Sequence, residues 1–376
     1  MEGIEKIKKL NKNRVKELQK QTEKKIIGWI CRYTPEEIIH ASGAIPYRVY
    51  LGGTEDTPTS DANTLFGSRV CPFARGILGY KLIGNALNFL SGIVSTHTCD
   101  AMRCLLEIWR IHITHPSFIY QIHLPRNKRE EGLNYFKKGL AKFTDALERF
   151  LNVSITNARI FNSIKLINLT RKLLKEFQEK RKSISLPISG SDAFEVYHAA
   201  MILDKLEFNE LLSSLLKEID RYPKINGKKR ILYSGSILAE QDKRFHEIVE
   251  GAGGIIVFED TCTACRYASD LIDEKFENPL DAIASFHFNR IQCPRMREPE
   301  GLSRLNYVLK AIEDYHIDGV IYHTLKFCDN YKYDYQIFRE ELKKIDIPIL
   351  NVESEYGVDL GRLKTRIEAF IELIGD

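Results

Sequence analysis

Short apolar runs alternate with longer segments of helical periodicity along most of the chain. Apolar runs of about five to seven residues, bounded by Gly, Pro or polar residues, are typical of strands. We predict seven such strands, at residues 45–51, 92–96, 118–124, 230–234, 254–258, 318–323 and 347–352. Helical spacing predicts helices among and after them, at residues 74–90, 101–110, 241–250, 302–315, 334–344 and 360–374. Because parallel strands need a crossover connection, this order predicts parallel βαβ units.

A long helical segment separates the two groups of predicted strands. Residues 129–222 show no strand pattern and are interrupted only near residues 186–190. We therefore predict an α/β protein with two Rossmann-like (flavodoxin-like) parallel-sheet domains, the first of which carries this long helical insertion. The polar segment 223–229 is the predicted linker, so the domains are expected to span residues 1–225 and 226–376.

Two helices are predicted before the first strand. Residues 5–26 carry apolar side chains at roughly helical spacing among many charges, which is typical of an amphipathic surface helix. A short second helix is expected to begin with Thr34 as its N-cap and Pro35 at its first helical position. This helix is expected to end near Gly43.

Composition and charge exclude several classes of protein. Of the 376 residues, 44% are hydrophobic and 28% are charged, which is ordinary for a globular chain and excludes disorder as the main state. The 55 Lys and Arg residues nearly balance the 51 Asp and Glu residues, so we expect no dedicated nucleic-acid binding. Residues 1–26 lack an apolar export signal, and no run of 18 apolar residues occurs. We therefore expect a cytoplasmic protein without a membrane segment.

The eight cysteines are too sparse for a disulfide scaffold, and a reducing cytoplasm disfavours disulfides. Cys99, Cys262 and Cys328 each stand just past the end of a predicted strand. Such carboxyl ends form the ligand-binding edge of an open parallel sheet, so these thiols are expected to meet in an interdomain cleft. The further candidates are Cys71 before a helix, Cys104 in a C-x4-C spacing with Cys99, Cys265 in a C-x2-C spacing with Cys262, and Cys293 in a loop.

Four chemistries remain for cysteines in such a cleft. They are inert buried thiols, a thioredoxin-like redox pair at Cys262 and Cys265, half of a zinc site at the same pair, and an iron–sulfur cluster. Inert thiols are not expected at so many strand ends, the redox pair lacks its usual small domain, and the zinc site lacks a second close ligand pair. Dispersed cysteines can bind an iron–sulfur cluster when the fold gathers them, but the spacing alone does not decide between zinc and iron–sulfur.

Six landmarks along the chain carry a family resemblance. They are Gly28-Trp29-Ile30-Cys31 with Pro35-Glu36-Glu37 and Gly43-Ala44-Ile45-Pro46; Cys71-Pro72-Phe73-Ala74-Arg75; Cys99-Asp100; Glu259-Asp260-x-Cys262 with Arg266-Tyr267; Cys328-Asp329; and Thr365-Arg366-Ile367-Glu368-Ala369-Phe370. With these landmarks, over most of its length, the chain resembles the component D subunits of (R)-2-hydroxyacyl-CoA dehydratases and benzoyl-CoA reductases.

This resemblance implies a [4Fe-4S] cluster on three cysteines, which correspond to Cys71, Cys99 and Cys328. It also implies an open iron site and electrons delivered by a separate ATP-hydrolysing iron–sulfur activator protein. In such dehydratases a one-electron reduction of a thioester forms a ketyl radical, which makes a β-proton removable. Relatives pair two chains of this type, so we expect a homodimer or a heterodimer with a paralogue.

The chain has more cysteines than the three of the dehydratase pattern. In the double-cubane branch of the family, six cysteines bind an [8Fe-9S] cluster, and the protein reduces small molecules. The resemblance to this branch implies the metal ligands Cys71, Cys99, Cys104, Cys262, Cys293 and Cys328, with Cys265 as a substitute for Cys262 or Cys293. We therefore predict an oxygen-sensitive, ATP-coupled reductase of a small substrate. The alternatives are a lyase subunit that dehydrates an (R)-2-hydroxyacyl-CoA and a non-catalytic electron carrier.

Other residues near the landmarks have both a functional and a structural interpretation. His97 either bonds to cluster sulfur or carries protons, or it is an ordinary histidine at a strand end. Arg69 and Arg75 either raise the reduction potential of a cluster or form salt bridges. Glu259 and Asp260 either donate protons or cap the following turn.

Two further features are expected to be structural. Cys31 precedes a predicted helix cap, and we expect no ligand role for it. A basic run on the helical insertion is expected to be a solvated helix face, although it has the charge to dock an acidic activator or CoA phosphates. This run comprises Lys172, Lys175, Lys180, Arg181 and Lys182.

Overall fold

The computed structural model describes residues 2–84, 86–126, 128–296, 302–357 and 361–375. Two four-stranded sheets form its frame, and every pair of neighbouring strands is parallel. The first sheet has the order β2-β1-β3-β4 and consists of β1 (Ile26–Ile30), β2 (Ile45–Arg48), β3 (Gly92–His97) and β4 (Phe118–His123). The second has the order β6-β5-β7-β8 and consists of β5 (Lys229–Gly235), β6 (Gly254–Asp260), β7 (Gly319–Leu325) and β8 (Ile349–Ser354).

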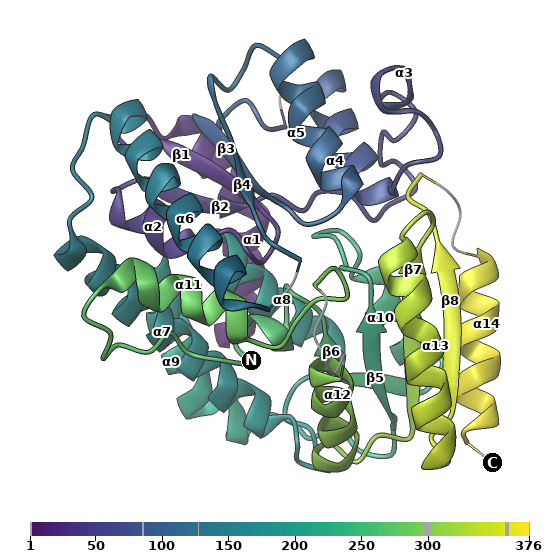
Figure 1. Ribbon diagram of the computed structural model, residues 1–376. Helices are drawn as coiled ribbons and strands as arrows, with labels where there is room; N and C mark the ends of the chain where they lie inside the picture. The colour runs from purple at the N-terminus through teal and green to yellow at the C-terminus, as the bar shows by residue number, and fades with distance from the viewer. Residues whose placement is uncertain (1, 85, 127, 297–301, 358–360, 376) are drawn as a thin grey trace.

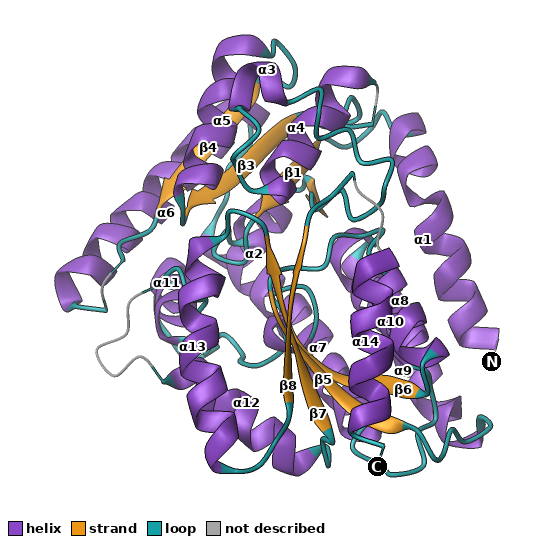
Figure 2. Ribbon diagram, turned by 90° about the vertical axis from the view of Figure 1, so that its right-hand side faces the viewer, coloured by secondary structure: helices purple, strands orange, loops and turns teal. Residues whose placement is uncertain are grey.

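Helices flank both sheets (Figure 1). Figure 2 shows α12 and α13 on one side of the second sheet and α10 and α14 on the other. The helices are α1 (Glu2–Lys20), α2 (Glu36–Ala41), α3 (Asn63–Phe66), α4 (Pro72–Ile83), α5 (Asp100–His112), α6 (Glu130–Leu151), α7 (Asn157–Lys180), α8 (Gly190–Ile202), α9 (Lys205–Glu218), α10 (Arg244–Gly251), α11 (Pro279–Asn289), α12 (Ser303–Asp314), α13 (Asp329–Lys344) and α14 (Gly361–Leu373). Short 3₁₀ turns lie at Ile219–Arg221 and Cys265–Tyr267.

The predicted fold class is confirmed, since the structure is α/β with two parallel sheets, and each of the seven predicted strands is present. The prediction missed β1, because the helix expected over residues 5–26 covered its start. In the structure α1 ends at Lys20, and β1 lies between β2 and β3 with all five residues buried. The domain boundary near residue 225 stays a prediction, because one continuous apolar core reaches residues of both sheets.

The start of α2 differs from its predicted capping. Thr34 does not cap the helix; its hydroxyl donates to the carbonyl oxygen of Ile30 at 2.7 Å, and the helix begins at Glu36. The helical insertion also has a break that the pattern missed. After α6 the chain turns at Asn152, whose φ of 52° is left-handed, a conformation that asparagine tolerates at a helix end.

The carboxyl ends of the two sheets face the same seam between the halves of the molecule (Figure 2). Residues that directly follow β1, β3, β5 and β6 line one common cavity there. This is the edge at which open parallel sheets bind their ligands. No helix within the described ranges is long and apolar enough to span a membrane.

Candidate functional site

A small, mostly enclosed cavity of about 40 Å³ lies at this seam, and five cysteines contribute to its wall. Apolar side chains from both halves complete the wall around the thiols. The cysteines of the wall are Cys31, Cys71, Cys99, Cys262 and Cys293. The apolar residues include Ile30, Phe73, Met102 and Ile237.

Strand ends and helix starts position these thiols. Cys31 directly follows β1 and has a left-handed φ of 72°, which turns the chain sharply out of the sheet. Cys71 is the N-cap of α4, with Pro72 at the first helical position, and Cys99 is the N-cap of α5. Cys328 is likewise the N-cap of α13. Cys71, Cys99 and Cys328 therefore all stand at helix N-termini, which favour negative charge.

Cys71, Cys99 and Cys328 act on one another electrostatically. Burial raises the pKa of Cys71 to about 12, and the charges of Cys328 and Cys99 add to that increase. Burial also raises the pKa of Cys328; Arg295 opposes the increase, whereas Cys99 and Cys293 add to it. Cys328 is therefore close to this group, although its side chain does not line the cavity itself.

Cys293 and Cys31 have different surroundings. Burial favours the neutral thiol of Cys293, but Arg295 and Arg266 outweigh it and lower its pKa to about 7. Burial raises the pKa of Cys31, and the charge of Cys262 adds to this rise. The thiolate is the metal-binding form of cysteine, so nearby cations favour binding at Cys293.

Arginines reach the sulfurs directly. The buried Arg48, at the end of β2, donates from Nη2 to Cys262 Sγ at 3.6 Å, and its guanidinium stacks 4.2 Å above the centre of the Trp29 ring. Arg295 donates from Nη1 to Cys293 Sγ at 3.4 Å. Neither arginine was singled out by the sequence. The contact of Arg48 depends on the fold, because Cys262 lies 214 positions away, whereas the separation of only two positions between Arg295 and Cys293 was a local signal that the sequence interpretation missed.

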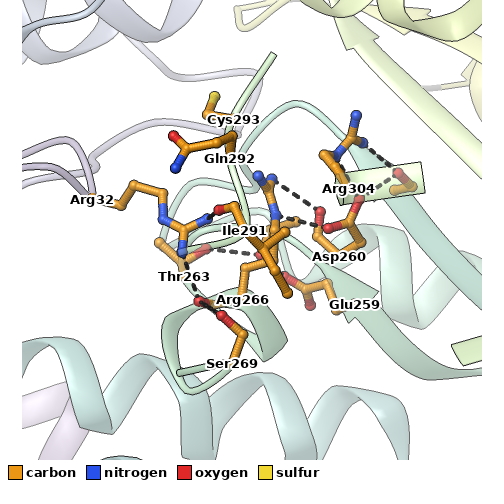
Figure 3. A network of polar contacts seen from close by, with 12 residues as sticks. Arg32, Glu259, Asp260, Thr263, Arg266, Ser269, Ile291, Gln292, Cys293 and Arg304 are labelled. Atoms are coloured by element: carbon orange, nitrogen blue, oxygen red, sulfur yellow. Dashed lines mark hydrogen bonds and ion pairs between the residues drawn. The ribbon is translucent and has the colours of Figure 1, made fainter. Parts of the chain in front are cut away.

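A buried polar network supports the Cys293 side of the cavity (Figure 3). Arg266 forms an ion pair with Asp260 (Nε to Oδ1, 2.7 Å) and donates a hydrogen bond to the hydroxyl of Tyr331 (3.0 Å). That hydroxyl lies 3.7 Å from Cys293 Sγ. Arg304 contacts the other oxygen of Asp260 at 2.8 Å, so this carboxylate holds two arginines in place.

Besides Cys328, two further predicted ligands do not line the cavity. Cys104 lies on α5, about one turn beyond the lining residue Ala101, and is not among the lining residues. Cys265 is buried and lies 3.4 Å from the hydroxyl of Tyr197, which donates to its sulfur or accepts from it. Cys31, expected to be structural, instead occupies the wall. Cys31 directly follows β1, and this place at a strand end would have predicted its position in the wall. The sequence pattern missed β1, however, and so missed Cys31 with it.

Most other predicted functional residues have structural partners. Arg75 forms a 2.5 Å ion pair with Glu355, and Arg69 is exposed. The ring of His97 packs edge-on against His123, with the ring centroids 5.6 Å apart. Glu259 lies 3.3 Å from His246, so the structural interpretation fits it and its neighbour Asp260.

The basic run at the end of α7 is largely engaged within the chain. Lys180 pairs with Asp220 at 2.5 Å, and Lys182 contacts Asp314 at 3.1 Å. Arg181 is buried and donates to backbone carbonyls, among them that of Ile256. Two of the five members, Arg181 and Lys182, therefore hold the second half of the chain against the insertion, whereas Lys180 pairs within the insertion.

The cavity residues fit an anionic iron–sulfur cluster. Arg32 Nε, Arg48 Nε and Nη1, and Arg295 Nε are buried and have no acceptor within the described residues. Leaving such cationic N–H groups unpaired is costly, and an anion in the cavity would offset that cost. Among the described residues, no three His, Cys, Asp or Glu side chains gather tightly enough to hold a metal ion. Cysteines spread around a wall match a cluster, which takes each thiolate on a separate iron.

Comparison with known proteins agrees with the resemblance. The family model described as "2-hydroxyglutaryl-CoA dehydratase, D-component" matches residues 31–374. The chain is 28% identical to the (R)-phenyllactyl-CoA dehydratase beta subunit of Clostridium sporogenes and 26% identical to the lactoyl-CoA dehydratase subunit beta of Anaerotignum propionicum. Both matches cover 94% of this chain and 93% of the relative.

A reductase subunit is similar as well. The chain is 21% identical to a subunit of the benzoyl-CoA reductase of Thauera aromatica, over 91% of this chain and 88% of the relative. The family match covers strands β2 to β8 and every cysteine of the cavity wall. The chain therefore belongs to the 2-hydroxyglutaryl-CoA dehydratase D-component family.

Proposed function

We propose that this chain binds a double-cubane [8Fe-9S] cluster and reduces a small substrate with electrons from an ATP-hydrolysing iron–sulfur activator. The observation that carries the proposal is that five cysteines line one mostly enclosed cavity and a sixth, Cys328, lies close enough to act on Cys71 electrostatically. When bound, such a cluster supplies low-potential electrons. The ligands we propose are Cys31, Cys71, Cys99, Cys262, Cys293 and Cys328. Cys31 thus takes the place that the sequence interpretation assigned to Cys104.

The six thiols fall into two groups of three. Mutual charge effects connect Cys71, Cys99 and Cys328, the group that the family resemblance implies as ligands of a single cubane. Cys31 and Cys262 are similarly connected. Cys293 acts on Cys328 of the first group, but we assign it to the second group because its sulfur, like those of Cys31 and Cys262, has a polar side-chain partner. Two groups of three match two cubanes with three protein ligands each.

The residues of the wall suit a reduction. Arg48 and Arg295 offset negative charge that would otherwise oppose the uptake of an electron. Apolar residues such as Phe73 and Met102 exclude water, which lowers the local dielectric constant and strengthens these charge effects.

A second candidate function is a lyase subunit that dehydrates a 2-hydroxyacyl-CoA. It is favoured by the similarity to two subunits of acyl-CoA dehydratases. This function requires only one cubane, on Cys71, Cys99 and Cys328. It leaves unexplained why three further cysteines approach the same cavity.

We also propose that the chain acts as a dimer, with an identical chain or a paralogue. The three relatives described above are all named as subunits of larger enzymes. Light scattering after anaerobic size-exclusion chromatography checks this, and a mass equal to one chain would contradict it.

Metal analysis after anaerobic purification tests the cluster. We expect about eight irons and acid-labile sulfide per chain, because each cubane holds four irons. Cys31→Ser should lower the iron content to about half, since it removes one ligand of the second cubane. Cys104→Ser is the matched control and should leave the iron content unchanged, because Cys104 does not line the cavity.

Two other results of the metal analysis would contradict the double cubane. About four irons, unaffected by Cys31→Ser, would contradict the double cubane and favour the dehydratase function. Anaerobic turnover of a 2-hydroxyacyl-CoA with activator, ATP and a strong reductant would then confirm that function. Zinc without labile sulfide would contradict both.

A further inference from the structure

The two groups of cysteines differ in the side chains that bond to their sulfurs. In the group of Cys31, Cys262 and Cys293, each sulfur has at least one polar side-chain partner. Arg48 donates to Cys262 at 3.6 Å and Arg295 to Cys293 at 3.4 Å, while Thr98 Oγ1 lies 3.6 Å from Cys31 Sγ.

Tyr331 adds a second hydrogen bond to this group. Arginine has no acceptor atom, so in the contact with Arg266 the tyrosine oxygen accepts the hydrogen bond. A metal-bound thiolate can only accept, so the hydroxyl proton of Tyr331 is directed at Cys293 Sγ, 3.7 Å away. The Asp260 carboxylate fixes Arg266 and thereby this orientation.

The group of Cys71, Cys99 and Cys328 lacks such support within the described residues, where no side-chain donor reaches these three sulfurs. Backbone amides serve instead, that of Ala74 for Cys71 and that of Tyr331 for Cys328. The two arginines that donate hydrogen bonds to sulfur, Arg48 and Arg295, therefore both contact the group of Cys31, Cys262 and Cys293.

Hydrogen bonds to sulfur and nearby positive charge both raise the reduction potential of an iron–sulfur cluster. Building on the function proposed above, we propose that the two halves of the bound cluster have unequal potentials. The half held by Cys31, Cys262 and Cys293 is reduced first, because the hydrogen bonds of Arg48, Arg295 and Tyr331 all go to its sulfurs. The charge of Arg295 also acts on Cys71 and Cys328, so the hydrogen bonds make the difference between the halves. The half held by Cys71, Cys99 and Cys328 is then the stronger reductant. Arg48 and Tyr331 are accordingly positioning residues that act through the sulfurs.

Redox titration of the anaerobically purified protein, followed by electron paramagnetic resonance, tests this inference. With Ti(III) citrate as the reductant, we expect two one-electron steps. Tyr331→Phe and Arg48→Gln should each lower the equilibrium constant of the first step about tenfold, which corresponds to 59 mV for one electron. The second step should move much less. These residues come from separate elements and contact different sulfurs, so a shift of the same step by both variants identifies the half involved.

Tyr197→Phe is a matched control, because Tyr197 is also a buried tyrosine in contact with a cysteine sulfur, that of Cys265. Since Cys265 does not line the cavity, this variant should leave both potentials unchanged. Iron content is measured in each variant to show that the cluster is intact.

The outcomes separate the two proposals. About eight irons with two steps that shift together, or with no shift in Tyr331→Phe and Arg48→Gln, would overturn this inference and leave the double cubane standing. About four irons with a single step would overturn the double cubane and this inference with it.

Discussion

Asp260 is fully buried and is the single carboxylate that holds both Arg266 and Arg304. Removing one partner of a buried ion pair leaves a charge that is neither hydrated nor compensated. We expect Asp260→Asn to lower the free energy of unfolding by about 3–5 kcal/mol. Denaturant unfolding under anaerobic conditions measures this change.

A surface ion pair provides the comparison for Asp260. Lys310 is exposed and contacts Asp314 at 3.1 Å, and exposed pairs contribute about 0–1 kcal/mol. Lys310→Gln should therefore have little effect on unfolding. Equal effects of Lys310→Gln and Asp260→Asn would contradict the structural role of the Asp260 network.

Among the residues of the site, those that follow directly after strands could be predicted from the sequence. Cys99, Cys262 and Cys328 stand at strand ends that the sequence pattern located, so their approach to one sheet edge could be expected. Arg48 could not be found in this way. Its sulfur partner, Cys262, lies 214 positions away, and only the packing of the two halves joins them.

At the scale of elements, the strands were more predictable than their exact limits. Buried parallel strands read as continuous apolar runs, and seven of the eight strands in the described structure carry that signal. β1 does not, because two lysines precede it and Gly28 interrupts it. Gly28 is needed there, since a Cβ atom would lie 2.8 Å from the Leu90 side chain. The position of Cys31 in the cavity wall was missed for the same reason, because it follows from β1.

α2 has only six residues, too few for a helix to be stable by itself. Two buried ion pairs fix it. Glu37 contacts Arg171 of α7 at 2.5 Å, and Glu36 contacts Lys205 of α9 at 3.0 Å. Because α2 follows Cys31 after only a short turn, these pairs also hold one wall of the cavity.

Glu37→Gln tests this arrangement. Arg171 would lose its counter-charge in the interior, so we expect a loss of about 3–5 kcal/mol in the free energy of unfolding. Hydrogen exchange should also become faster at the amides of α2, because local opening becomes easier. Asp220→Asn, which breaks an exposed ion pair with Lys180, is the control and should cost less than about 1 kcal/mol. Unchanged hydrogen exchange at the amides of α2 in Glu37→Gln would show that the ion pair with Arg171 does not hold this helix in place.

At the scale of the whole molecule, the two halves meet through polar contacts as well as apolar ones. Arg75, on the helix that follows Cys71, pairs with Glu355 just beyond β8. Asp242, before α10, lies against the 52–53 loop, since a Cβ atom at Gly53 would be 2.6 Å from its Cγ. Asp242 is only 2% exposed, and within the described residues its Oδ2 has no hydrogen-bond partner.

This buried carboxyl makes stability depend on pH. Burial raises the pKa of Asp242 to about 7; Arg244 opposes that rise, and Glu259 adds to it. An aspartate in an unfolded chain has a pKa of about 3.9. Between about pH 4 and pH 7 the folded state therefore binds more protons at this site than the unfolded state does. Stability must then fall as the pH rises through this window, by up to roughly 1.4 kcal/mol per unit, and level off above it.

Asp242→Asn removes the titrating carboxyl and should therefore make the free energy of unfolding fall less as the pH rises. The variant should gain stability relative to the native protein as the pH rises from 5 to 8, because it no longer has to bury a charge at the seam. Denaturant unfolding at several pH values, with the cluster kept intact under anaerobic conditions, measures the two curves. Asp220→Asn alters an exposed carboxyl and should keep the native slope. If the Asp242→Asn curve ran parallel to the native one, Asp242 would already be charged in the folded protein, and the seam would have to hold a counter-charge or water beside it.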